Sequence, residues 1–264
     1  MKKIALVAAV FVLFMCSILC THAETPDSEA RVLPNEFFAQ MDSYMYMQQN
    51  STHPISFYLI YKAKTPFDGR TLYRLYLTGN KSIDFYEVKL QESGGFPDMG
   101  YAAASIMCQA CFNEVGHYEF DSITLLFDDG SSETYPIGRF VIDVSDEAGS
   151  DVLDTYATVA MNTLQDVFHG KYTIEGETAV DGIEVSLDVY AKCQLKVQKT
   201  EAGFEVENKM TSDRPVVYRF IVPHLEAVCG EEKQTVYVNV GCVCGGADVT
   251  YEKMVNAYWA WNAE

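Results

Sequence analysis

Basic residues are scarce in this sequence. Its 264 residues hold 19 Lys and Arg against 37 Asp and Glu, which gives a formal net charge of −18 at pH 7. Nucleic acids and anionic lipid surfaces carry the same sign of charge and would be repelled, so neither is an expected partner. Cationic ligands and divalent metal ions have the complementary charge, although a solvated acidic surface is the simpler interpretation.

Recognisable catalytic motifs are also lacking. The sequence contains no serine-hydrolase elbow, no zinc-protease helix and no glycine loop of the kind that holds phosphates. Histidine is rare, with five residues, and the pairing of a Cys111 nucleophile with His117 has only closeness in sequence to support it. The sequence therefore leans against an enzyme without deciding the question.

Long apolar runs are missing except at the start of the chain. Lys2 and Lys3 precede the apolar run 4–19, and the small-residue pattern ends at Ala23. This order is typical of a signal peptide cleaved after Ala23, because the run falls short of the roughly 20 residues that a spanning helix needs. Cleavage would remove two lysines and change the charge from −18 to −20. We expect a secreted or cell-envelope protein with no stable membrane span.

What the sequence has in quantity is residues that favour strands. It is 48% hydrophobic, with 17 Tyr and 15 Phe, which argues against general disorder. Short apolar and β-branched runs separated by turn residues predict strands at 55–64, 71–78, 83–91, 123–128, 133–144, 172–175, 183–190, 193–199, 204–208, 216–222 and 235–244. The polar turn 128–132, which contains Gly130, predicts a hairpin between two of them.

Helical spacing of apolar residues occurs in three segments. The pattern at 35–48 favours a helix, although Tyr44–Met47 also suits the start of a strand. A second helix is predicted from an N-cap at Ser150 or Asp151 to a stop at Gly170. The third prediction is a closing helix over 249–261.

These elements predict an α+β, β-rich fold with antiparallel sheets and a few packed helices, in two subdomains, with a single two-layer domain as the alternative. We divide the chain into a signal peptide (1–23), a flexible lead (24–33), a β-rich subdomain with an N-terminal helix (34–148), and a second subdomain in which a helix precedes antiparallel strands and a C-terminal helix (149–264).

Six cysteines remain after the predicted cleavage. In an exported protein they predict disulfides first, with a pairing that spacing cannot resolve. A four-thiolate zinc site built from Cys108, Cys111, Cys242 and Cys244 is the alternative; without it, we expect no cofactor. A redox pair at Cys108 and Cys111 is disfavoured, because the preceding residues do not resemble a strand. The disulfide candidates are Cys108, Cys111, Cys193, Cys229, Cys242 and Cys244.

Two weaker patterns concern ligands. Acidic residues from Asp143 to Asp154 imitate a calcium loop, but Ala148 stands where that loop needs glycine, so an acidic linker is the better interpretation. Tyr44, Tyr46, Trp259 and Trp261 could form an aromatic platform for sugars or peptides, but the helical pattern of 249–261 makes the two tryptophans diverge and favours a core position for Trp259.

The leading hypothesis is a non-enzymatic extracellular or cell-envelope module that binds a protein, peptide or glycan. The alternatives are an exported enzyme with a cysteine-centred site and a structural zinc-thiolate protein.

Overall fold

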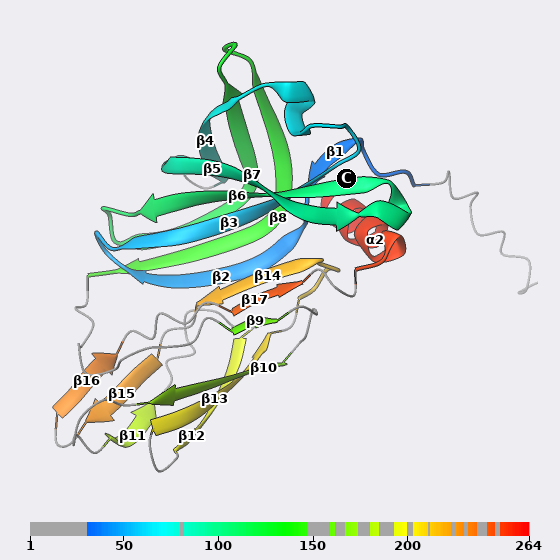
Figure 1. The fold of residues 1–264 in the computed structure, drawn as a ribbon. Helices are drawn as coiled ribbons and strands as arrows, with labels where there is room; N and C mark the ends of the chain where they lie inside the picture. Colours follow the sequence, from blue (N-terminus) through cyan, green and yellow to red (C-terminus); the bar gives the residue numbers. More distant parts are fainter. Residues whose placement is uncertain are drawn as a thin grey trace, which may run out of the picture. The chain divides into compact units, whose positions relative to one another are not determined.

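Among the residues that the structure describes, strands make up most of the fold, and one α-helix lies close to the C-terminus (Figure 1). The computed structural model describes residues 31–79, 82–146, 159–161, 167–173, 180–184, 193–199, 203–210, 212–222, 225–229, 232–236, 242–245 and 249–263. The predicted signal peptide lies outside these residues and stays a prediction. No helix among the described residues is long and apolar enough to cross a membrane.

The elements follow one another along the chain with short links in the first half. The first eight strands are β1 (Glu36–Phe38), β2 (Met41–Gln48), β3 (Thr52–Tyr61), β4 (Leu72–Gly79), β5 (Ser82–Phe96), β6 (Tyr101–Cys111), β7 (Gly116–Phe127) and β8 (Ser132–Ser145), with 3-10 turns at Pro66–Gly69 and Pro97–Met99. The remaining elements are β9 (Val159–Met161), β10 (Val167–Thr173), β11 (Val180–Glu184), β12 (Cys193–Lys199), β13 (Gly203–Met210), β14 (Tyr218–Val222), β15 (Leu225–Cys229), β16 (Glu232–Val236), β17 (Cys242–Gly245) and α2 (Tyr251–Asn262).

Eleven strands share one sheet, in the order β1-β3-β6-β5-β4-β7-β8-β2-β14-β17-β9. Two further sheets have three strands each, β10-β13-β12 and β11-β15-β16. The large sheet contains strands from both sides of residue 148, so the expected division into two subdomains is not confirmed. Its pairing is mixed, because β2 runs parallel to both β8 and β14, and β9 runs parallel to β17. The predicted antiparallel pairing therefore holds for the other strand pairs of this sheet and is wrong for these three.

The large sheet folds over on itself because two segments change partners. The first residues of β5, up to Phe85, pair with β4, and its later residues pair with β6. Glu87, with φ of 51°, lies at the change of direction. The segment β1–β2 does the same, since β1 pairs with β3 and β2 pairs with β8. The folded sheet thus forms two layers, and the core lies between them.

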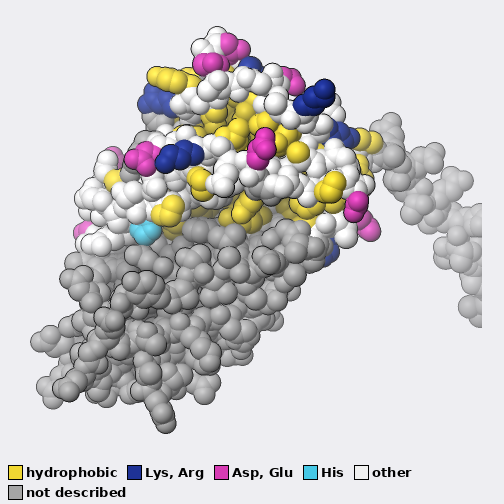
Figure 2. Space-filling model, in the orientation of Figure 1, with side chains coloured by type: hydrophobic (Ala, Val, Ile, Leu, Met, Phe, Trp, Pro, Cys, Tyr) yellow, Lys and Arg dark blue, Asp and Glu magenta, His cyan; other side chains and the backbone are white. Residues whose placement is uncertain are grey.

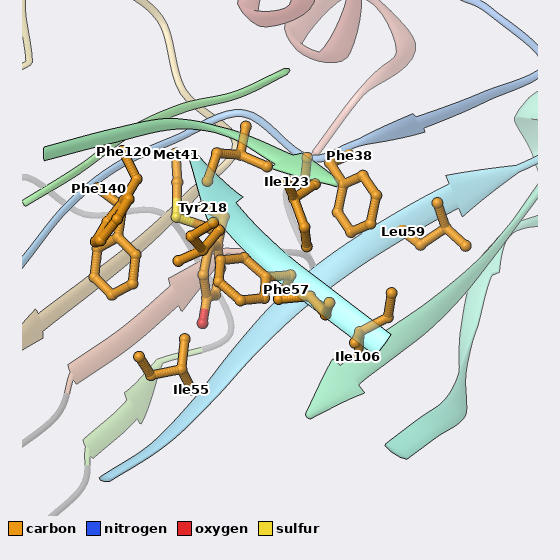
Figure 3. Close-up of a cluster of buried hydrophobic side chains, with 14 of the residues drawn as sticks. Phe38, Met41, Ile55, Phe57, Leu59, Ile106, Phe120, Ile123, Phe140 and Tyr218 are labelled. Carbon is orange, nitrogen blue, oxygen red and sulfur yellow. The ribbon is translucent and has the colours of Figure 1, made fainter. Parts of the chain in front are cut away.

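Aromatic and aliphatic side chains fill the space between these two layers (Figure 3). Phe57 on β3 meets Phe140 on β8 edge to face, with ring centroids 6.2 Å apart, and both side chains are almost completely buried. Phe38 on β1 packs in the same manner against Tyr135 on β8. Buried apolar area and edge-to-face ring contacts of this kind stabilise the fold.

The helix predicted at 35–48 is wrong, because these residues form β1 and β2. Strand β2 is buried on both faces: Met41, Met45 and Met47 belong to the main core, while Tyr44 and Tyr46 pack in a second cluster with Val141. A strand that is apolar on both faces shows no period-two alternation. The helix-like spacing was therefore a by-product of an almost continuous apolar run.

The helix predicted between Ser150 and Gly170 is wrong wherever the structure describes it. Val159–Met161 forms β9, and Val167–Thr173 forms β10, which pairs along its whole length with β13. The first part of the prediction, residues 150–158, lies outside the described residues. A long ladder with a distant strand outweighed a weak local preference for helix.

The hairpin and the closing helix are confirmed. Strands β7 and β8 are joined by the turn at Asp128–Ser131, and Figure 2 shows acidic side chains around the tip of this hairpin. Helix α2 begins after Thr250, whose hydroxyl accepts a hydrogen bond from the Lys253 amide at 3.2 Å. An N-cap of this type satisfies one of the unpaired amides of the first turn.

Candidate functional site

A bulge interrupts the centre of the sheet. Phe120 pairs with Phe140, and Ser122 pairs with Pro136, so three residues of β8 face the single residue Asp121 of β7. Gly138 lies within the bulge at a φ of +91°. Bulges bend a strand and redirect its side chains, and they occur often beside functional sites. Here the bulge leaves Asp121 exposed at the surface of the sheet.

A buried ion pair lies next to the bulge. Asp42 on β2 is directly opposite Arg139 on β8, and the guanidinium donates to both carboxylate oxygens at 2.6 to 2.8 Å. The hydroxyl of Ser212 donates to Asp42 Oδ2 at 2.7 Å. Asp42 is completely buried, whereas the side chain of Arg139 is 22% exposed. A paired and hydrogen-bonded carboxylate avoids most of the cost of burying a charge.

The C-terminal end of α2 brings a tryptophan to the same region. The indole N–H of Trp261 donates to the Pro215 carbonyl at 2.9 Å, which fixes the ring against the segment before β14. The guanidinium of Arg214 lies over this ring, 5.0 Å from its centroid, as a cation–π contact. Helix α2 and the segment before β14 are thus distant from the bulge in sequence but lie beside it in the fold.

The bulge, Arg139, Arg214 and Trp261 line one hollow of about 690 Å³, which we call the Trp261 hollow. Its volume falls within the range of about 300 to 1,000 Å³ that is usual for small-ligand sites. The lining combines two guanidinium groups, two carboxylates, an indole, an amide and two hydroxyls. The lining residues are Gly79, Glu119, Phe120, Asp121, Ser122, Thr134, Pro136, Gly138, Arg139, Arg214, Trp261 and Asn262.

Sequence analysis found only one member of this site, Trp261, which it placed in a platform with Tyr44 and Tyr46. The structure separates them, because both tyrosines are buried on β2 and Trp261 lines the hollow. Trp259 is half-buried and packs edge to face on Tyr258.

A second polar cluster ties β1 to the β7–β8 hairpin. The Tyr135 hydroxyl lies within hydrogen-bonding reach of Glu133 and of Glu36 Oε1, the latter at 2.8 Å. Arg70 donates to Glu133 at 2.5 Å and packs on the Phe127 ring, 4.0 Å from its centroid. The hydrogen bond from Tyr135 and that from Arg70 hold the pKa of Glu133 below its usual value, whereas burial and both carboxylates raise the pKa of Tyr135. Because these side chains form hydrogen bonds with one another, we interpret the cluster as a structural link between β1 and the hairpin.

His117 forms a further pair with Asp143, its direct neighbour across β7 and β8. The distance from Nδ1 to Oδ1 is 2.7 Å, and the His117 side chain is 53% exposed. Asp143 also began the calcium-loop pattern, whose later residues from Glu147 lie outside the described residues. Among the described residues, no three His, Cys, Asp or Glu side chains converge as metal ligands would.

The two cysteines of β6 do not act as a pair. Both carry free thiols, with Cys108 buried in the core and Cys111 half-exposed. Residues three apart on a strand face opposite sides, so their thiols point away from each other. Contrary to expectation, the residues before Cys108 do form a strand, because Ala102–Ala104 and Ile106 pack against β3 and β5.

The disulfide and zinc predictions otherwise stay predictions. Cys193 begins β12, Cys229 ends β15, and Cys242 and Cys244 lie on one face of β17. The side chains of these four cysteines lie outside those that the structure describes.

Cys108 is expected to resist alkylation in the folded protein. Burial raises the pKa of its thiol to about 12, so at pH 8 only about one thiol in ten thousand is ionised, and the thiolate is the reactive form. Treatment of the native protein with iodoacetamide, followed by peptide mass spectrometry, should label Cys111 well before Cys108, and denaturation should expose both. Equal labelling of the two cysteines in the native protein would contradict this expectation.

Comparisons with known proteins identify no family. No family model matches the sequence, and no curated protein matches it. Among solved structures, fibronectin(III)-like modules of Clostridium thermocellum CbhA are 9% identical, with 82% of this chain and 97% of that chain covered and a TM-score of 0.23. The titin domains Z1Z2 in complex with telethonin are 12% identical, with 83% and 100% covered and a TM-score of 0.24.

A third solved structure is SGBP-B of the Bacteroides ovatus mixed-linkage glucan utilization locus, in complex with a mixed-linkage heptasaccharide. It is 8% identical, with 76% of this chain and 43% of that chain covered and a TM-score of 0.24. Likenesses this low place the chain in no family.

Proposed function

We propose that this protein is a secreted, non-enzymatic interaction module that binds a polar ligand in the Trp261 hollow. The observation that carries the proposal is the composition of the hollow, where fixed guanidinium, carboxylate, amide and indole groups converge in a space of about 690 Å³. A few convergent polar groups beside an aromatic ring are typical of ligand sites. Secretion rests on the predicted signal peptide.

Two side chains that line the hollow are already held in place by hydrogen bonds to other groups, which favours binding. Arg139 is anchored by Asp42, and the Trp261 indole is anchored by the Pro215 carbonyl. Side chains that are ordered before a ligand arrives lose little conformational freedom on binding, so more of the contact energy appears as affinity. The bulge contributes Asp121 and Gly138 to the lining of the site.

The cysteine-centred enzyme receives no support from β6. A cysteine nucleophile needs an accessible thiol with a lowered pKa. Cys108 is buried and its pKa is raised, and Cys111 lies on the other face of the strand. We therefore look for function at the Trp261 hollow.

A thermal-unfolding screen of the full chain tests this proposal. We expect at least one ligand from a library of peptides, oligosaccharides and metabolites to raise the melting temperature. At a hundred times its dissociation constant, a ligand stabilises the folded state by about 2.7 kcal/mol, or roughly 5 to 10 °C for a chain of this size. The shift should disappear in Trp261→Ala and Arg214→Gln and persist in Tyr73→Ala, whose exposed ring lies on β4 and outside the hollow.

Mass spectrometry of each ligand after incubation provides the second readout, and we expect every ligand to be recovered unchanged. Conversion of a ligand to a product, with loss of that conversion in Trp261→Ala, would show that the hollow is an active site. A shift that both hollow variants retain would show that the ligand binds elsewhere.

A further inference from the structure

Charges of both signs line the Trp261 hollow. Arg139 and Arg214 supply two positive charges, and the exposed Glu119 and Asp121 on β7 supply two negative charges. Arg139 is moreover already paired with the buried Asp42. An anionic ligand would meet the two exposed carboxylates and the net charge of −18 on the chain, and a cationic ligand would meet the guanidinium groups. The arrangement favours a ligand without net charge.

The hydrogen-bonding groups of the lining are of mixed type. Guanidinium groups only donate, carboxylates only accept, and the hydroxyls of Ser122 and Thr134 do both. A ligand that satisfies such a set needs many groups that both donate and accept. Hydroxyl groups have this property, whereas a peptide backbone alternates fixed donors and fixed acceptors.

The indole adds an apolar surface with a fixed orientation. Its N–H is engaged by the Pro215 carbonyl and the Arg214 guanidinium lies over the ring, so Trp261 offers the hollow the remaining ring surface and no donor. A sugar ring has an apolar face of C–H groups, which packs on an aromatic ring, and an edge of hydroxyls that would reach the surrounding polar groups. The exposure of Glu119, Asp121, Thr134 and Arg214 leaves the hollow open to solvent at its rim, so a chain of sugars can extend beyond it.

We infer that the ligand of the Trp261 hollow is a neutral carbohydrate chain, an inference that rests on the proposed binding function. One sugar ring packs on Trp261, while its hydroxyls bond to Arg214, Asp121 and Glu119. Neighbouring sugars continue along the open rim. Recognition therefore depends on stacking and on charge-assisted hydrogen bonds to hydroxyls, and it needs no metal ion.

The test uses the full chain and defined probes. Neutral oligosaccharides of glucose, mannose, xylose, galactose and N-acetylglucosamine are screened on an array, and any that bind are measured by isothermal titration calorimetry. Oligogalacturonate serves as the anionic probe and oligolysine as the cationic probe. We expect a neutral oligosaccharide to bind, with affinity at least about tenfold lower in Trp261→Ala and largely retained in Trp261→Phe, which keeps an aromatic ring.

Further variants distinguish a loss of ligand contacts from a folding defect. Asp121→Asn changes a carboxylate that is exposed at the surface of the sheet, and it should weaken binding about threefold to tenfold through the loss of a charge-assisted hydrogen bond. Tyr73→Ala should leave the affinity unchanged. The melting temperature of each variant without ligand shows whether its fold is intact.

The outcomes separate this inference from the proposed function. Binding of oligogalacturonate or oligolysine that depends on Trp261, without binding of neutral sugars, would overturn the carbohydrate and leave the hollow as a ligand site. Undiminished sugar binding in Trp261→Ala and Asp121→Asn would overturn the assignment to the hollow. If no probe binds, the carbohydrate inference is wrong, and the thermal screen decides on the proposed function independently.

Discussion

Replacement of Gly138 by alanine should lower the free energy of unfolding by about 3 to 4 kcal/mol. A Cβ atom at this position would lie 2.2 Å from the Met41 carbonyl oxygen and 2.9 Å from the Met41 nitrogen. Strand β2 would have to move away from β8 at the centre of the sheet. The backbone of Gly138 also has φ of +91°, a conformation that alanine adopts only with strain. Urea denaturation followed by circular dichroism measures the change.

Gly130 provides the matched control for this prediction. Its φ of +82° is similar, but no atom lies within 4 Å of an added Cβ in the β7–β8 turn. Gly130→Ala therefore keeps the backbone strain without the clash, and it should cost only about 1 kcal/mol. Equal losses in the two variants would show that β2 and β8 absorb the extra methyl group without separating.

The second large effect is expected at Arg139. Arg139→Met keeps most of the side-chain volume but removes the guanidinium that donates twice to Asp42 Oδ1 and once to Oδ2. Loss of one partner from a buried ion pair costs about 3 to 5 kcal/mol, because the other charge stays buried. Since Arg139 is partly exposed, we expect a loss of about 3 kcal/mol by the same denaturation measurement.

The double variant Asp42→Asn, Arg139→Met separates the charge from the packing. It removes the buried carboxylate together with its partner, so it should be more stable than Arg139→Met alone by about 1 to 2 kcal/mol. A double variant that is less stable than the single one would mean that Asp42 is held by its other contacts, such as the Ser212 hydroxyl, and not by Arg139.

Sequence patterns predicted most strands but failed for a strand that is buried on both of its faces. Strands β7 and β8 and their hairpin were predictable because one face is apolar and the turn contains Gly130. The segment Met41–Met47 was assigned to a helix because methionines on one face and tyrosines on the other are all apolar. Only the pairing of β2 with β8 and β14 decides between strand and helix there, and those partners lie far away in sequence.

The candidate site was predictable in one respect. The buried positions of β7 change from even to odd numbers, with Tyr118 and Phe120 before the bulge and Ile123, Leu125 and Phe127 after it. Such a change of phase in a strand pattern indicates a bulge. By contrast, Arg214 and Trp261 reach the hollow, and Asp42 reaches Arg139, through contacts between distant segments, and no local pattern in the sequence marks these contacts.

The position of β2 also sets the order in which the chain can fold. One of its neighbours, β8, follows about a hundred residues later, and the other, β14, does not occur until Tyr218–Val222. Contacts between residues so far apart in sequence form slowly, because a long loop must close before they contribute. Until β14 arrives, one edge of a strand that is buried along most of its length in the folded protein stays open to pairing with other chains. Shortened versions of the chain that end before residue 218 should therefore aggregate.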